Sequence, residues 1–112
     1  MKIGDRPIRW MAGALQTPPV GVAARIEAGF LLRRIQRGES LGMPRARAMP
    51  AIGPRVHELR VNDCEKKLTW RIVYRIDRDA ILVVHWFDKK TRRTPEGVIE
   101  LCKRRLREYD RG

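Results

Sequence analysis

The stretch from Arg55 to Pro95 decides the fold, because three strand-like segments follow one another within it: RVHELR (55–60), WRIVYRI (70–76) and ILVVHWFDKKTRRTP (81–95). Side chains in a strand alternate between two faces. In the middle segment, one face therefore holds Trp70, Ile72, Tyr74 and Ile76, and the other holds Arg71, Val73 and Arg75. The third segment is apolar from residue 80 to 87, which is typical of a well-covered strand. Short polar links at 62–68 and 77–79 indicate antiparallel hairpins.

Each of these segments also carries cations. Strands normally avoid such charge unless one face of the sheet binds an anion. The alternation predicts that Arg60, Arg71 and Arg75 share a solvated face of the sheet. Four further cations, Lys89, Lys90, Arg92 and Arg93, follow the last strand and are expected at the end of that face. We therefore look for function on this side of the sheet.

The segments before this stretch indicate a strand and helices. Residues 6–10 (RPIRW) are strand-like, and residues 11–16 have the composition of one or two helical turns. A helix is expected from Pro19 to Arg37, with Gly38 as its C-terminal cap. Its apolar residues form two opposite stripes: Val22, Ala23, Ile26 and Phe30 on one, and Ala24, Ala28, Leu31, Leu32 and Ile35 on the other. A helix of this kind requires cover on both sides.

The remaining segments complete a single domain spanning residues 1–112. Residues 39–54 contain Pro44, Pro50 and Pro54 and show no periodicity, which predicts a long connection. Thr94 and Pro95 predict a capped helix start, followed by one apolar stripe to the C-terminus. We expect an α+β fold in which a small antiparallel sheet of about four strands is packed by N-terminal helices and a C-terminal helix.

Charge is the strongest compositional signal. The chain has 112 residues and a formal net charge of +12. Arginine dominates the cations, which favours planar, bidentate contact with phosphate or carboxylate groups. The charge implies a partner that is nucleic acid or an acidic protein. There is no signal peptide or membrane-length apolar run, so a cytoplasmic protein without membrane contact is expected.

Metal and cofactor chemistry find little support. Cys64, Cys102, His57 and His85 are the soft ligands of the chain, and they lack paired spacing. We expect no metal site, no cofactor and no disulfide framework.

Several motifs together resemble the RelE/ParE superfamily of toxins from type II toxin–antitoxin modules, and most closely its HigB-like, phage-derived branch. Members read ELR, then YR-x-x-Y, then LH-x-F-x-KK-x-x-x-TP. The matching residues are Glu58, Leu59 and Arg60; Arg71 and Tyr74; and His85, Phe87, Lys89, Lys90, Thr94 and Pro95. The better-known RelE members carry lysines where this chain has Val56 and Glu58. Their C-terminal tyrosine has no clear counterpart other than Tyr109.

The resemblance implies a RelE-like fold and a ribosome-dependent mRNA endonuclease that stops translation. Cleavage in this family proceeds without metal, by attack of the ribose 2′-hydroxyl on the adjacent phosphate. By position, the catalytic residues would be Arg60, Arg71, Lys89 and Lys90. The expected RNA-binding residues are Arg75, Arg92, Arg93, Arg45 and Arg47. The implied partners are the ribosome, mRNA and a cognate antitoxin with a helix-turn-helix fold, acidic where it contacts the helix at 19–37.

Ordinary structural roles compete with these assignments. Arg71 fits a solvated cross-strand ion pair with Glu58 as well as a phosphate contact. His85 fits a buried, hydrogen-bonded histidine better than a proton donor, and Tyr74 and the three tryptophans fit the core. At the level of function, two alternatives stay open. One is a ParE-like toxin that inhibits DNA gyrase, and the other is a non-enzymatic basic module that binds RNA or DNA.

Overall fold

The computed structural model describes residues 5–88 and 92–112, and it confirms the predicted α+β class. In chain order the elements are β1 (Ile8–Trp10), α1 (Val22–Gln36), β2 (Ala46–Ala48), β3 (Val56–Asp63), β4 (Leu68–Ile76), β5 (Ile81–Asp88) and α2 (Glu96–Arg111). The strands form one sheet in the order β1-β5-β4-β3-β2. Lys89 and Lys90 lie outside the described residues, so their predicted roles stay predictions.

The sheet is mixed and has one strand more than expected. Strands β2 to β5 pair antiparallel, and the central β3–β4–β5 meander is the one that the sequence predicts. The additional strand is β2, which lies inside the proline-rich connection. Strand β1 runs parallel to β5, with Ile8 opposite Ile81. Its alignment is held by backbone hydrogen bonds from Ile81 to Pro7 and from Met11 to Val83, both 2.9 Å long.

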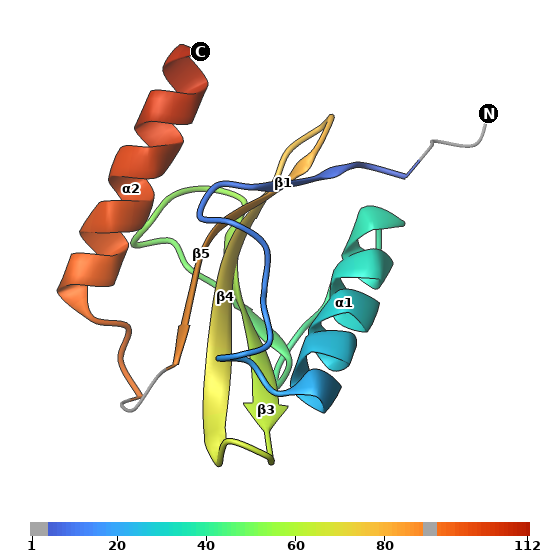
Figure 1. The fold of residues 1–112 in the computed structure, drawn as a ribbon. Coiled ribbons are helices and arrows are strands. Elements are labelled where there is room, and N and C mark those ends of the chain that lie inside the picture. The colour runs from blue at the N-terminus through green and yellow to red at the C-terminus, as the bar shows by residue number, and fades with distance from the viewer. Residues whose placement is uncertain (1–4, 89–91) are drawn as a thin grey trace.

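The two helices cover opposite faces of this sheet (Figure 1). On one face, α1 packs in a core with Leu59, Val61, Trp70 and Ile72. On the other, α2 contributes Cys102 and Leu106 to a second core with Val73, Leu82 and Val84. Figure 1 shows α2 beside the end of the sheet that lies away from the β3–β4 hairpin. Near that hairpin, no helix of the described residues covers the α2 side of the sheet.

Helix α1 is shorter than predicted but ends as expected. Gly38 has a φ of +97° and donates its N–H to the carbonyl of Ile35 at 2.9 Å, so it terminates the helix. The helical turns expected over residues 11–16 are wrong, because this segment lies against the sheet. Gly13 there has a φ of +84°, and its carbonyl accepts a hydrogen bond from the indole of Trp86 at 3.1 Å.

A β-bulge in β5 changes which residues face α2. Val73 of β4 lies opposite His85, whereas the next residue, Tyr74, lies opposite Val83. Val84 is therefore the extra residue, and it joins His85 on the α2 side. The bulge thus directs His85 toward α2, where Arg105 contacts it.

Candidate functional site

Two rows of side chains cross the α2 side of the sheet near the uncovered end. The register aligns one row across four strands and a second row across three. The first row is Arg47, Glu58, Val73 and His85, and the second is Arg60, Arg71 and Phe87. The charged members of these rows form what we call the sheet-face site: Arg47, Glu58, Arg60 and Arg71, together with Thr94.

Glu58 is the centre of the sheet-face site and has no solvent exposure. Its Oε1 accepts a hydrogen bond from Nη1 of Arg71 and lies 3.4 Å from Nη2 of Arg47. Its Oε2 accepts a 2.9 Å hydrogen bond from the hydroxyl of Thr94. The Arg71–Glu58 ion pair is therefore confirmed. This pair is buried rather than solvated. Through its three contacts, Glu58 links β3 to β2, to β4 and to the segment before α2.

Thr94 corrects a sequence-based expectation. The sequence predicts a capped start for α2, but the N-cap residue is Pro95, and no side chain caps the helix. Thr94 is buried and directs its hydroxyl to Glu58 instead. The sequence pattern around Thr94 is that of a helix start and carries no signal for its contact with Glu58.

Burial also corrects the expected position of Arg71, which is only 6% exposed and not on a solvated face. Its Nε, like the Nε of Arg47, is buried and finds no acceptor among residues 5–88 and 92–112. A buried N–H without a partner costs roughly 1–3 kcal/mol. Both Nε atoms have almost no exposed surface, so an external acceptor reaches them only after these side chains move.

The charge of the sheet-face site favours an anion as that acceptor. Three guanidinium groups (Arg47, Arg60 and Arg71) face one carboxylate (Glu58), which leaves a net charge of +2. Burial lowers the pKa of Arg71, Glu58 opposes this effect, and the neighbouring Arg60 and Arg47 add to it. Arginine remains protonated under these conditions. The excess positive charge is therefore built into the sheet, and phosphate oxygens are suitable acceptors for it.

A cavity of about 500 Å³ extends the site toward the N-terminal end of α2. Arg47 and Thr94 line it together with Arg92, Arg93 and Lys103. Arg92 and Arg93 are exposed, and both make interactions within the protein. The structure thus brings two of the predicted RNA-binding arginines, together with Arg47, close to the sheet-face site.

Arg75 does not lie on the solvated face that the sequence predicts. It is only 7% exposed, and its guanidinium group is paired with carboxylates. Its Nε and Nη2 donate to Asp77 at 2.7 and 2.9 Å, and its Nη1 and Nη2 donate to Asp110 at 3.0 and 2.7 Å. The hydrogen bonds to Asp110 and Asp77 raise the pKa of Arg75. The expectation of a solvated Arg75 is wrong, because this side chain fastens the end of α2 to the β4–β5 turn.

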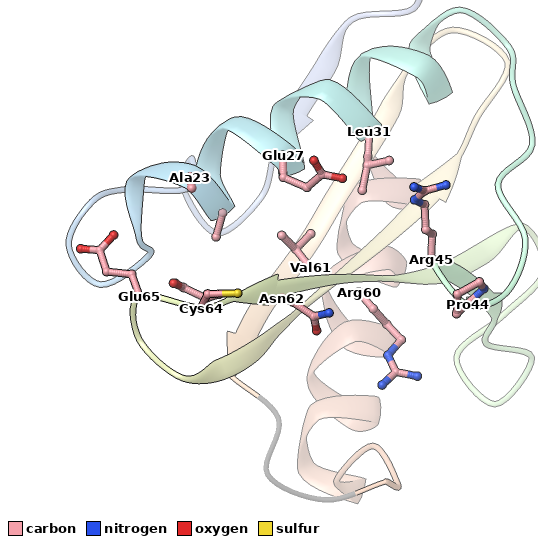
Figure 2. A pocket seen from close by; sticks show the side chains of 12 residues that line it. Ala23, Glu27, Leu31, Pro44, Arg45, Arg60, Val61, Asn62, Cys64 and Glu65 are labelled. Carbon is pink, nitrogen blue, oxygen red and sulfur yellow. The ribbon is translucent and has the colours of Figure 1, made fainter.

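Arg45 lies on the other side of the sheet edge. A cavity of about 770 Å³ separates α1 from β3, and Arg45, Leu31 and Val61 are among its lining residues. In Figure 2, Arg45 points toward α1, whereas the Arg60 side chain leaves the opposite side of β3. The structure therefore does not bring Arg45 into the sheet-face site.

His85 is half-buried and hydrogen-bonded, as expected. Nη1 of Arg105 donates to the carbonyl of Val84 at 2.8 Å and lies 3.2 Å from Nδ1 of His85. Because a guanidinium can only donate, Nδ1 must accept, and the ring carries its proton on Nε2. Burial and Arg105 both lower the pKa of His85. The expected core position of Tyr74 is also confirmed, since its side chain is buried, and this burial raises its pKa to about 12.

Within the described ranges, no group of three or more histidine, cysteine or acidic side chains could hold a metal ion. No helix in these ranges is long and apolar enough to cross a membrane. Cys64 and Cys102 are both free thiols. Burial raises the pKa of Cys102 to about 11.

The comparison with protein families identifies the family to which the chain belongs. The family model described as "Phage derived protein Gp49-like (DUF891)" matches residues 20–107, which include α1, the four strands β2 to β5 and most of α2. The chain belongs to the Gp49-like family. This family is phage-derived and is associated with RelE-like toxins. No curated protein and no solved structure shows a significant match to the chain.

Proposed function

We propose that this Gp49-like protein is the toxin of a type II toxin–antitoxin module, of the HigB-like branch, and acts as a ribosome-dependent mRNA endonuclease. The observation that supports this best is the sheet-face site, where a net charge of +2 and two unmatched arginine donors lie on one face of the sheet. Such a surface suits an RNA phosphate. The family's association with RelE-like toxins points in the same direction.

The proposed cleavage begins with attack of a ribose 2′-hydroxyl on the adjacent phosphate. A new bond forms between the 2′-oxygen and phosphorus, the bond from phosphorus to the 5′-oxygen breaks, and one proton moves from the nucleophile to the leaving group. Negative charge grows on the phosphate oxygens during this step. Preorganised donors placed at such oxygens stabilise the transition state. In our proposal Arg71 has this role, Arg60 assists it across the strand pair, and no metal is required.

Glu58 acts in this scheme as a positioning residue. It is fully buried, and its two oxygens already accept from Arg71 and Thr94 and contact Arg47. It therefore holds the guanidinium of Arg71 in place between β3 and β4. Arg92 and Arg93, with Lys89 and Lys90 before them in sequence, would bind the RNA backbone on either side of the cleaved phosphate.

The same proposal assigns partners and setting. The substrate is mRNA on the ribosome, the inhibitor is a cognate antitoxin with a helix-turn-helix fold, and the setting is the cytoplasm. The net charge of +12 suits both an RNA substrate and an acidic inhibitor.

Induction of the gene, followed by mapping of mRNA 5′ ends, tests the proposal. We expect new 5′ ends within translated regions, and translation should stop before replication does. A chain carrying Arg78→Ala, which removes one exposed cation at the β4–β5 turn, should behave as the unmodified chain does. Intact mRNA together with early failure of replication and gyrase activity would replace the proposal with the ParE-like alternative.

A further inference from the structure

Helix α1 leaves an apolar stripe in solvent on the side that faces away from the sheet. Val22 is 49% exposed, Ile26 66% and Phe30 61%. The opposite side of the helix is buried in the first core. Its residues there are Ala24, Ala28, Leu31, Leu32 and Ile35. The second of the two predicted stripes is thus covered by the protein's own sheet, whereas the first has no cover from the described residues.

The spacing of the exposed positions is that of a helix–helix seam. Val22, Ile26, Gly29 and Arg33 follow one another at intervals of four, three and four residues, which is the a/d repeat of a coiled coil. Phe30 lies beside this seam. A Cβ added to Gly29 would meet no atom within 4 Å. Gly29 is therefore not required by the fold, and its lack of a side chain would let a second helix approach closely.

The charges around this seam select the kind of partner. Arg25, Arg33 and Arg34 lie within α1 and Arg37 follows it as its C-cap, against the single acid Glu27. Arg33 pairs with Asp5 at 2.5 Å and Arg34 with Glu39 at 3.0 Å. Among the described residues, no carboxylate pairs with Arg25 or Arg37. A second copy of this chain would bring more arginine to the same place, and like charges would oppose its binding.

We propose that the outer face of α1, formed by Val22, Ile26, Gly29, Phe30 and Arg33, is a docking surface for an acidic amphipathic helix of a partner protein. The surface runs from residue 22 to residue 37, so it accepts a partner helix of about four turns, or roughly 22 Å. The partner's apolar seam would cover Ile26 and Phe30, and its flanking acids would pair with Arg25 and Arg37. An acidic helix would avoid the neighbouring groove, whose lining includes Glu27 and Glu65 (Figure 2).

This inference rests on the proposed function in one respect, since it supplies a surface for the inhibitor which that function requires. It also goes further. The outer face of α1 and the sheet-face site lie on opposite sides of the sheet, so a helix bound to α1 does not touch Arg71 (Figure 1). Partner binding and anion binding are therefore separable by substitution.

Binding is measured directly on the full chain labelled with ¹⁵N. The probe is a synthetic peptide of three heptads with leucine at positions a and d and glutamate at e and g. A scrambled peptide of the same composition has the same charge but no seam, and serves as the control for electrostatic attraction alone. We expect the heptad peptide to shift the resonances of α1 and to leave those of Arg60 and Arg71 unchanged. It should bind at least tenfold more tightly than the scrambled peptide.

Three variants sharpen the test. Ile26→Gln with Phe30→Gln should weaken heptad-peptide binding by tenfold or more, whereas Tyr109→Gln, which changes an exposed aromatic of α2, should not. Gly29→Leu adds apolar surface, so it would strengthen non-specific binding, but it should weaken binding that requires close approach at Gly29. Thermal unfolding of each variant verifies that the fold is retained.

Three outcomes would overturn the proposal: equal binding of both peptides, resonance shifts confined to the sheet-face site, and stronger binding by Gly29→Leu. Self-association of the chain that disappears in Ile26→Gln with Phe30→Gln would assign the surface to a second copy instead. None of these measurements uses ribosomes or RNA. A chain that binds the heptad peptide but leaves mRNA intact would therefore contradict the proposed function and support the docking surface.

Discussion

Arg60 and Arg71 lie directly opposite each other on neighbouring strands, β3 and β4. Like charges in this relationship normally destabilise a sheet. Glu58, on the strand paired with that of Arg71, neutralises the charge of Arg71. Arg60 has no carboxylate partner among the described residues. An anion bound between the two arginines would relieve this repulsion. Without such a ligand, replacing Arg60 by a neutral residue should stabilise the protein, whereas replacing Arg71 would leave the buried Glu58 without its main cation.

The first prediction concerns the replacement of Arg71 by lysine. Lysine keeps a positive charge beside buried Glu58, so the fold is retained, but it lacks the planar fork and the free Nε. If Arg71 stabilises a charged transition state, cleavage should slow by about a hundredfold or more. Ribosome affinity should change little, because many other cations share the electrostatic binding. Single-turnover cleavage on programmed ribosomes and a binding titration separate the two effects. Normal cleavage by Arg71→Lys would remove this residue from the catalytic group.

The second prediction concerns Arg92 and Arg93. If both contact phosphates, Arg92→Gln with Arg93→Gln should weaken RNA binding. Each lost contact with single-stranded RNA should also reduce the slope of log affinity against log salt by about 0.7. The matched control is Arg78→Gln with Arg104→Gln, which removes two exposed cations elsewhere and should leave the slope nearly unchanged. Equal slopes for the two double variants would mean that only the net charge matters.

The third prediction compares Gly21, the N-cap residue of α1, with Gly29 inside the helix. Gly21 donates its N–H to Asp63 at 2.7 Å, and a Cβ at this position would lie 2.5 Å from the carboxylate. Gly21→Ala should therefore destabilise the fold by roughly 1–3 kcal/mol, as overpacking does. Gly29→Ala adds a methyl group in open space within α1, and it should stabilise the protein by about 0.5–1 kcal/mol. Chemical denaturation measures the free energy of unfolding, which should fall for Gly21→Ala and rise for Gly29→Ala relative to the parent.

The fourth prediction is the acid response of Asp63, which is 2% exposed. Burial by itself would raise the pKa of this carboxyl. The hydrogen bonds from Trp70, Gly21 and Lys66 outweigh that effect, so the pKa is lowered. Asp63 therefore stabilises the fold above the pKa of an unfolded aspartate, about 3.9, and this contribution is lost as the pH falls through the folded value.

A pH titration of unfolding tests this sign. Asp63→Asn should be less stable than the parent at neutral pH, and the difference should shrink as the solution becomes acidic. Asp79→Asn, an exposed aspartate in the β4–β5 turn, is the control and should leave the profile nearly unchanged. A difference for Asp63→Asn that grows in acid would show that the pKa is raised in the folded protein.

Local patterns predicted most of the elements. The period-two alternation in residues 70–76 located β4 and placed Tyr74 in the core, and the helical stripes of α1 separated its buried residues from its exposed ones. Gly38 marked the end of α1 because only a positive φ closes the helix there. These features depend on a few neighbouring residues, so the sequence contains them directly.

The parts that the sequence did not predict depend on distant contacts. Alternation showed that Arg71 and Arg75 share a face, but it could not show that Glu58 and Asp110 would bury their guanidinium groups. Asp110 is 35 positions away from Arg75. Strand β2 has little strand character of its own and forms by pairing with β3. The sequence did not predict the bulge at Val84. A bulge shifts the alternation between the two faces of a strand, and an almost wholly apolar run shows no alternation that could reveal the shift.

The parallel pairing of β1 with β5 bears on how the protein is made. Ile8 finds its partner only at Ile81, 73 positions later, and the buried carboxylate of Glu58 receives its hydroxyl donor from Thr94. A ribosome adds about 5–20 residues each second. Strand β1 therefore cannot pair until β5 has been synthesised. The sheet-face site likewise cannot be completed until Thr94 has been added. A chain released early would have neither, and under the proposed function such truncated translation products should not cleave mRNA.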